Sequence, residues 1–191
     1  MRPMMLRETL DRPAPARDEA GEAPRAADRG DAPFDLRPAS PAAACPVVFA
    51  SPHSGRLYPR DMMAASALDD DAIRRSEDAW VDRLIEDAPG SGVTLLTARY
   101  ARAYIDVNRE PYELDAGMFS DALPAFAQSR TARVAAGLGS IARVVGEGQE
   151  IYRRKLTFEE ARRRIEAVHT PYHAALGRVL AESRRRWGRV V

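Results

Sequence analysis

The stretch "PVVFASPHSGRLYPR", residues 46–60, joins an apolar run to a histidine in a turn. The run "PVVFA" is short, apolar and β-branched, so it predicts a short buried strand. His53 follows between Pro52, whose ring fixes its own φ, and Gly55, which permits a close turn. A histidine in this place is a candidate metal ligand, a general base or a hydrogen-bonding anchor of the loop.

The composition of the whole chain limits the classes of protein to which it can belong. The chain has 191 residues, an ordinary apolar content of 45% and a net charge of +1, which suits one domain with a tail. So small a charge, without a recognition motif, predicts no nucleic-acid partner. Lys155 is the single lysine, which we interpret as a coding bias toward arginine rather than as a recognition surface.

Location follows from the cysteine and from the absence of apolar segments. Cys45 is the single cysteine, so the chain forms no internal disulfide, which favours a reducing cytoplasm. No run approaches the roughly 20 apolar residues that span a bilayer. The N-terminus lacks the apolar region of a secretory signal. We therefore expect a cytoplasmic protein that is not embedded in a membrane.

The N-terminal segment differs in composition from the rest. Residues 1–44 hold half of the chain's 14 prolines and are rich in Ala, Arg and Asp. Such a segment buries too little apolar area to offset the entropy of ordering it. We expect a disordered tail over residues 1–44 and a folded domain over residues 45–191.

Alternating signals follow His53 along the chain. Residues 70–87 predict one helix, capped by Asp69 or Asp70 and stopped by "PGSG". Residues 93–100, 103–110 and 138–145 predict strands, and the closing "GRVV" looks like the opening of another. The alternation predicts an α/β fold, in which sites collect at the carboxyl ends of strands, where His53 lies.

A long helix is expected near the C-terminus. Thr157 and Glu160 form the sequence pattern of a capping box, and an apolar stripe at helical spacing follows as far as Trp187. Pro171 interrupts this stripe and should kink or split the helix.

Adjacent carboxylates in "RRSEDAWVD" form a second candidate feature. Glu77 leans toward the apolar face of the predicted helix, whereas Asp78 lies on a neighbouring face. An inward carboxylate needs a partner, because burying it alone is costly. A metal ion shared with His53 would serve, and so would an arginine salt bridge.

The stretch "RAYIDVNRE" carries a third candidate feature. Asp106 and Asn108 share one face of the predicted strand, and Arg102 and Arg109 flank them. Guanidinium groups grip carboxylates bidentately, so the group could hold an acidic small molecule. A structural ion-pair network among Arg109 and nearby glutamates is the alternative.

Two histidines lie four residues apart on the long helix. His169 and His173 have a spacing that could bind a metal, but "HTPYH" lacks the H-E-x-x-H pattern and Pro171 disturbs the helix. We expect surface or packing roles for both.

Six strings resemble the N-formylglutamate amidohydrolase family, in the family's order, over about residues 46–190. They are "SPHSGRLYP", "RRSEDAWVDRL", "LLTARYARAYIDVNREPYELDAGMF", "RVAAGLGSIARVV", "IYRRKLTFEEARRRI" and "PYHAAL". The resemblance implies a phosphorylase/hydrolase-like, zinc-carboxypeptidase-related three-layer α/β fold. It also implies hydrolysis of the formyl C–N bond of N-formyl-L-glutamate, giving glutamate and formate in histidine breakdown. A divalent metal, expected to be zinc, would assist that reaction.

The resemblance also assigns residues. His53 matches the first metal ligand, and Glu77 matches the carboxylate ligand, with Asp78 as its rival. Arg102, Asn108 and Arg109 match the stretch expected near the carboxylates of an acidic substrate, a transfer that rests on charge.

Family members continue past this sequence, with a second histidine in a His-Ser-Met-Pro motif and a glutamate suited to acid/base work. We therefore expect the chain to be an N-terminal portion whose catalytic acid/base lies beyond residue 191. A catalytic zinc normally has three protein ligands, so we expect an incomplete metal site. The alternatives are an inactive fragment and an acidic-small-molecule binding domain.

Overall fold

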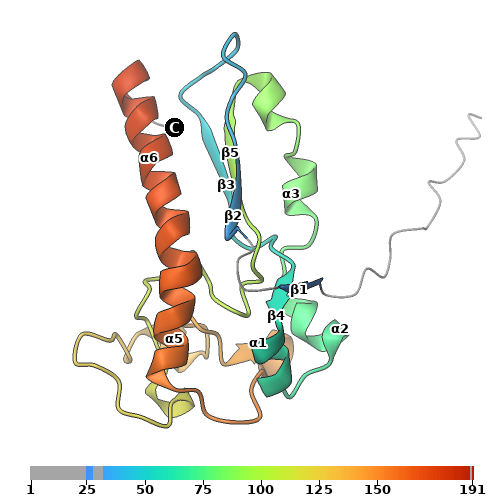
Figure 1. Ribbon diagram of the computed structural model, residues 1–191, viewed down its shortest axis with the longest axis vertical. Coiled ribbons are helices and arrows are strands. Elements are labelled where there is room, and N and C mark those ends of the chain that lie inside the picture. The colour runs from blue at the N-terminus through green and yellow to red at the C-terminus, as the bar shows by residue number, and fades with distance from the viewer. Residues whose placement is uncertain (1–24, 28–31, 190) are drawn as a thin grey trace, which may run out of the picture.

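The computed structural model describes residues 25–27, 32–189 and 191. Its central sheet has the order β2-β5-β3 and consists of β2 (Phe34–Arg37), β5 (Thr94–Ala98) and β3 (Val48–Ser51). β3 is parallel to β5, whereas β2 is antiparallel to it. Figure 1 shows α6 (Thr170–Trp187) running along one side of this sheet and α3 (Val81–Leu84) on the other. The predicted α/β class is confirmed as a mixed α/β fold.

The remaining elements are short. Two further strand pairs are β1 (Arg25–Ala27) with β4 (Leu57–Pro59), parallel, and β6 (Val144–Val145) with β7 (Gln149–Glu150), antiparallel. The other α-helices are α1 (Arg60–Ala65), α2 (Asp70–Ile73), α4 (Ala132–Ala135) and α5 (Phe158–Arg164). The 3-10 turns are η1 (Arg74–Ser76), η2 (Ala88–Ser91), η3 (Ala116–Met118) and η4 (Gly146–Gly148), and η5 (Ile165–His169) is a π-helical turn. Among the described residues, no helix has both the length and the apolar character of a membrane span.

The expected tail contributes a strand to the sheet. β2 lies within residues 32–44, pairs with β5 from Phe34↔Ala98 to Arg37↔Leu95, and packs Phe34 edge-on against Tyr172 at 6.4 Å. The prediction of a disordered segment up to residue 44 is therefore wrong for this strand. β1, over residues 25–27, also lies within the predicted tail and pairs with β4. Composition averaged over the tail hid both short strands, whose hydrogen-bonding partners are the edges of β5 and β4. The rest of the predicted tail, residues 1–24 and 28–31, lies outside the described residues.

The single helix predicted over residues 70–87 is wrong. Asp69 caps α2 as expected, by accepting a hydrogen bond from the Ala72 N–H at 2.8 Å. The helical path ends after η1, since Glu77 has an extended backbone and Trp80 is left-handed at φ 66°. Leu84, which a continuous helix over residues 70–87 would place on its apolar face, is 83% exposed.

The predicted strands fared unequally. The strand over residues 46–50 is confirmed as β3, but its predicted burial is wrong, since Phe49 is 40% exposed and Ala50 is exposed as well. The strand over 93–100 is confirmed as β5, whereas 138–145 yields only β6. Residues 103–110 form consecutive turns, in which Tyr104 and Ile105 both donate N–H to the Ala101 carbonyl. Because successive residues from Ala103 to Val107 are all buried, the alternation that a half-exposed strand requires is lost.

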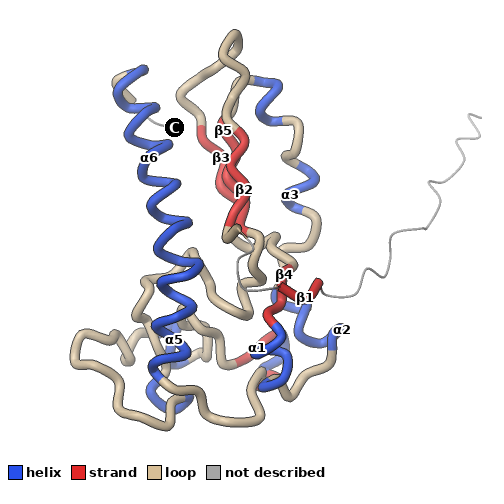
Figure 2. Tube along the Cα trace, viewed as in Figure 1, coloured by secondary structure: helices blue, strands red, loops and turns tan. Residues whose placement is uncertain are grey.

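The C-terminal helix confirms its predicted start. Thr157 and Glu160 form a reciprocal capping box, and helix continues through α5, η5 and α6 (Figure 2). Pro171 does not split it. The turn before the proline widens, so that the Thr170 N–H donates to the Ile165 carbonyl, and a local π turn is an established way to absorb such a disturbance.

Among the described residues of the strand expected at "GRVV", Val191 makes strand-like hydrogen bonds to the chain at the start of β3. Val191 donates its N–H to the Pro46 carbonyl at 2.9 Å and accepts from the Val48 N–H at 3.0 Å. These are the two hydrogen bonds of a parallel bridge, made at the start of β3.

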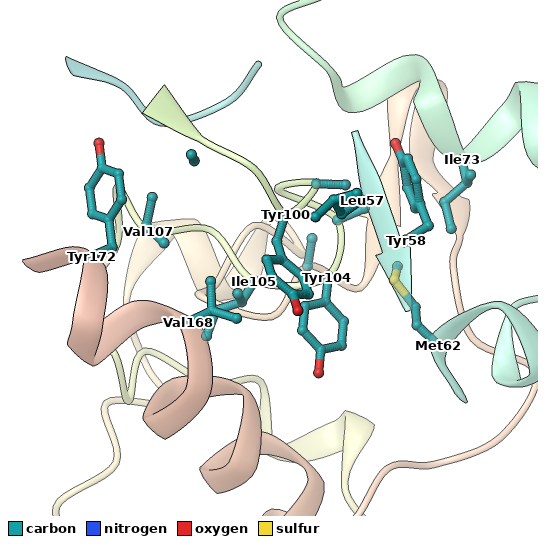
Figure 3. Packing of buried hydrophobic residues seen from close by; sticks show 14 of the residues in the cluster. Leu57, Tyr58, Met62, Ile73, Tyr100, Tyr104, Ile105, Val107, Val168 and Tyr172 are labelled. Atoms are coloured by element: carbon teal, nitrogen blue, oxygen red, sulfur yellow. The ribbon is translucent and has the colours of Figure 1, made fainter. Parts of the chain in front are cut away.

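The larger buried cluster begins at β5 in the sheet, with Leu96 and Ala98, and extends beyond the end of the sheet. Figure 3 shows Ile105 and Val107 packed near Val168 and Tyr172 of the long helix, with the Tyr100 and Tyr104 rings stacked alongside. The cluster fastens residues 101–107 to the helix that passes beside them. It thereby fixes the backbone on which the polar residues of the candidate site stand.

Candidate functional site

The His53 turn is pressed against the end of β5. A Cβ atom added at Gly55 would lie 2.2 Å from the Tyr100 carbonyl oxygen, so only glycine allows the two backbones to approach so closely. A hydrogen bond of 2.7 Å between the Ser51 and Ser54 hydroxyls closes the turn. The sequence interpretation of a turn that holds His53 in place is therefore confirmed.

Both ring nitrogens of His53 face carboxylates. Nε2 lies 2.8 Å from Asp106 Oδ1, and Nδ1 lies 3.3 Å from Asp78 Oδ2. The His53 carbonyl also accepts the Asp78 N–H at 3.1 Å. The imidazole is buried, so its orientation is fixed by these two carboxylates.

Asp106 is the buried member of this group, with a side chain only 4% exposed. Its Oδ1 also accepts the Asn108 N–H at 2.9 Å, and its Oδ2 accepts from Arg102 Nη2 at 2.8 Å. Burial alone would raise the pKa of Asp106, but the hydrogen bond from His53 and the charges of His53 and Arg102 outweigh it and lower the pKa. Asp106 is therefore an ionised acceptor for His53 Nε2 and Arg102, and the other ring nitrogen of His53, Nδ1, faces Asp78.

Asp78 forms the open side of the site. Its side chain is 52% exposed, and Arg102 Nη1 lies 3.8 Å from its Oδ1. Because Asp106 is buried and Asp78 is half-exposed, a ligand would approach His53 from the Asp78 side.

Glu77 lies elsewhere. Its carboxylate accepts from the Tyr58 hydroxyl at 2.6 Å and pairs with Arg74 Nε at 3.2 Å, and its side chain is 2% exposed. Burial and the adjacent Glu77 raise the pKa of Tyr58, so the phenol stays a donor. The inward carboxylate thus has the arginine partner that the sequence analysis kept as an alternative. The carboxylate beside His53 is Asp78, the rival, because the backbone leaves the helical path at Glu77.

The predicted substrate-binding residues gather around Asp106. Arg102 bonds Asp106 directly. Arg109 Nε lies 3.9 Å from Asp106 Oδ2 and donates to the Leu138 carbonyl, whereas Arg109 Nη1 donates to the Asn108 carbonyl. The Asn108 side chain is exposed. The structure brings Arg102, Asn108 and Arg109 together around Asp106, the partner of His53, although on a turn rather than on the predicted strand.

His169 and His173 have packing roles, as expected, but their targets were missed. His169 Nε2 lies 2.8 Å from the Arg109 carbonyl oxygen, and His173 Nε2 lies 2.7 Å from that of Val107. The His53–Asp106 pair was missed as well. No local spacing signals any of these three contacts, since their partners are separated in the sequence by 53, 60 and 66 positions.

The positions of His53, Asp78 and Asp106 can be compared with those of the ligands in a zinc centre. His53 Nδ1 and Asp78 Oδ2 are 3.3 Å apart, and two ligands of one tetrahedral zinc, at bonds of about 2.1 Å, lie about 3.4 Å apart. Asp106 bonds the second ring nitrogen, as outer carboxylates commonly do for metal-binding histidines. No group of three His, Cys, Asp or Glu residues placed to hold a metal occurs in the described ranges. The residues present fit two ligands of such a centre.

Known proteins resemble this chain in both sequence and structure. The sequence model of N-formylglutamate amidohydrolases matches residues 45–191. A crystal structure of N-formylglutamate amidohydrolase from Ralstonia eutropha JMP134 is similar, with a TM-score of 0.76 and 37% identity over 83% of this chain and 55% of that one. A gene product of Agrobacterium tumefaciens shares the fold, with a TM-score of 0.57 and 18% identity over 83% of this chain and 53% of its own.

The search of curated proteins found no match. Compared with the two solved structures, this chain spans about half of the length of each. Because the family match covers residues 45–191, the chain belongs to the N-formylglutamate amidohydrolase family.

Proposed function

We propose that this chain carries the His53 portion of a metal-dependent amidohydrolase site that hydrolyses the formyl C–N bond of N-formyl-L-glutamate. The observation that carries the metal dependence is His53 itself, with Nε2 fixed by Asp106 and Nδ1 facing Asp78. Family membership and the name of the Ralstonia eutropha relative support the amide-hydrolysing activity. Zinc, histidine breakdown and a three-layer zinc-carboxypeptidase-related fold rest on the family resemblance alone. The proposed cytoplasmic location rests on the single cysteine and on the sequence lacking a secretory signal.

In this proposal His53 Nδ1 and Asp78 hold the metal, and Glu77 is replaced as its carboxylate ligand. A bound zinc ion polarises a carbonyl oxygen and lowers the pKa of water. Asp106 keeps the imidazole in the required tautomer, because a carboxylate that accepts from Nε2–H leaves the Nδ1 lone pair free. Arg102 connects the two carboxylates, at 2.8 Å from Asp106 and 3.8 Å from Asp78.

The same turn supplies the groups for an acidic substrate. Asn108 is exposed, and the Arg109 guanidinium lies beside it. Amide and guanidinium donors recognise carboxylates, and N-formyl-L-glutamate carries two. We assign Asn108 and Arg109 to substrate binding, with Arg102 as the link between substrate and metal ligands. The catalytic acid/base is not assigned to any described residue.

Two metal ligands predict weak zinc binding and slow turnover by the 191-residue chain. The test is formate release from N-formyl-L-glutamate, measured with added zinc, with a chelator and in His53→Ala. Slow release that stops with the chelator and in His53→Ala is expected. Release that continues in the chelator would overturn the metal dependence, and brisk turnover would overturn the incomplete site.

A binding role without catalysis is the second candidate, favoured by the two guanidinium groups beside Asp106. Calorimetry with glutamate separates it from the first. Binding without formate release, weakened in Arg109→Ala, would support this role, whereas absence of binding, or binding unchanged in Arg109→Ala, would remove its support.

A further inference from the structure

Two histidines on the long helix reach the turn that carries Asp106. His169 closes the π turn η5, and His173 lies in the first turns of α6. Their rings stack with centroids 4.3 Å apart and planes inclined by 27°. Each Nε2 lies within 2.8 Å of a backbone carbonyl oxygen, which can only accept a hydrogen bond. Both rings therefore carry a proton on Nε2 and act as donors.

The acceptors are the carbonyls of Val107 and Arg109, one residue and three residues after Asp106. On its other side, the Asp106 N–H donates to the Ser140 carbonyl at 2.7 Å. The turn is thus held by the helix on one side and by the Ser140 backbone on the other, and its carboxylate is left facing His53 Nε2 at 2.8 Å.

The π turn is the feature that suggests more than packing. Such turns are rare within α-helices and frequently mark functional sites. Here the turn ends at His169, whose side chain is buried, and burial lowers the pKa of His169.

We propose that His169 and His173 are positioning residues of the His53 site, which hold the 106–109 turn through two Nε2–H donors so that Asp106 fixes His53. The inference rests on the proposed function only in that fixing His53 serves metal binding. A purely space-filling role would require the volume of the side chain at these positions, whereas positioning requires the donor.

Glutamine and methionine separate these two roles, because they have similar length and only glutamine donates. His173 is exposed, so His173→Gln and His173→Met leave the core intact, and His169→Gln and His169→Met repeat the comparison at the buried position. Val168→Ala is the control, since it removes core volume on the same turn without removing a donor.

The first measurement is the proton NMR signal of His53 Nε2–H, assigned by its absence in His53→Asn. It needs no metal and reports the bond to Asp106 directly. The second is the Kd for zinc alone, measured by calorimetry on the full chain. We expect His173→Met to lose the protected signal and to bind zinc about 10-fold more weakly, the lower end of the loss on removing an outer partner of a ligand. His173→Gln and Val168→Ala should keep both properties.

A protected His53 signal in both methionine variants would overturn the inference, as would an equal loss in Val168→Ala. If one methionine variant does not fold, the same measurements on the other decide between the two roles. A wild-type chain that shows the signal but binds no zinc would contradict the proposed metal site and not the positioning, which the signal tests by itself.

Discussion

Residues 70–87 and residues 157–187 carry similar helix signals, yet only the second segment forms a long helix. Both begin at a side-chain cap, Asp69 in one and Thr157 in the other. In the first segment the backbone itself bonds to the site, since the Asp78 N–H donates to the His53 carbonyl. In the second, the side chains of His169 and His173 reach the site and the backbone stays helical. A helix therefore survives next to a site when its side chains alone make the contacts.

The largest expected effect is at Asp106, which bonds His53 and whose turn accepts hydrogen bonds from His169 and His173 of the long helix. Asp106→Ala leaves the His53 imidazole and the Arg102 guanidinium without their partner in a buried place. Loss of one partner of a buried charged pair costs about 3–5 kcal/mol of unfolding free energy. Urea denaturation measures it. Asp78→Ala, on the half-exposed side, is the control and should cost less than about 1 kcal/mol. Equal losses would contradict a fixed Asp106 behind an open Asp78.

The next effect concerns the His53 turn. In Gly55→Ala the new methyl group would overlap the Tyr100 carbonyl, so backbone must shift at a cost of about 1–3 kcal/mol. A Cβ atom at Gly90 would meet nothing within 4 Å, so Gly90→Ala should change the unfolding free energy by less than about 1 kcal/mol. Thermal denaturation of the two variants checks the difference. An unchanged Gly55→Ala would show that the turn does not press on β5.

The broken helix can be tested at Trp80. In a left-handed conformation glycine is favoured over alanine by about 1 kcal/mol, whereas inside a helix alanine is favoured by about the same amount. We expect Trp80→Gly to be more stable than Trp80→Ala in chemical denaturation. Both variants lose the Arg56 guanidinium contact with the indole ring, so that loss cancels. The opposite order of stability would restore the continuous helix.

The intact helix gives a smaller effect at its cap. Thr157→Ala removes the acceptor of the Glu160 N–H and should lower the unfolding free energy by about 1 kcal/mol. Ser183→Ala, near the other end of the helix, removes only bonds of 3.4 Å and should lower it less. Equal losses would show that the Thr157 cap stabilises the helix no more than these two long hydrogen bonds do.

The cap also predicts a dependence on pH. The hydrogen bond from Arg154 lowers the pKa of Glu160 from 4.5 to about 2, with further help from Thr157. Because the folded pKa is below the unfolded one, the stabilisation is present above pH 4.5 and is lost as the pH falls toward about 2. Glu160→Gln should flatten this part of the stability curve, followed by circular dichroism. A curve that stays as steep as that of the wild type would exclude Glu160 as the titrating group.

Local signals predicted the parts of the fold that local physics controls. The strand before His53, the strand β5 and the capping box follow from apolar runs and caps, and all three are present. The 103–110 turns and the β2 strand escaped prediction because partners distant in sequence decide them.

The sequence predicted only part of the candidate site, because the other part also depends on contacts between residues distant in the chain. His53 and the Arg102–Arg109 stretch could be recognised from residue type and neighbours. The choice between Glu77 and Asp78 depended on where the backbone leaves the helix, which no spacing reveals. The pairing with Asp106 depended on how the turn after β5 folds back.

Zinc affinity of Asp78→Asn and Glu77→Gln tests the central claim most directly. Each substitution removes one negative charge and little volume, and the two residues are adjacent in the chain. With Asp78 beside His53 and Glu77 paired with Tyr58 and Arg74, calorimetry should show zinc bound at least about 10-fold more weakly by Asp78→Asn. Glu77→Gln should bind as the wild type does. Loss of affinity in Glu77→Gln with Asp78→Asn unaffected would contradict the account.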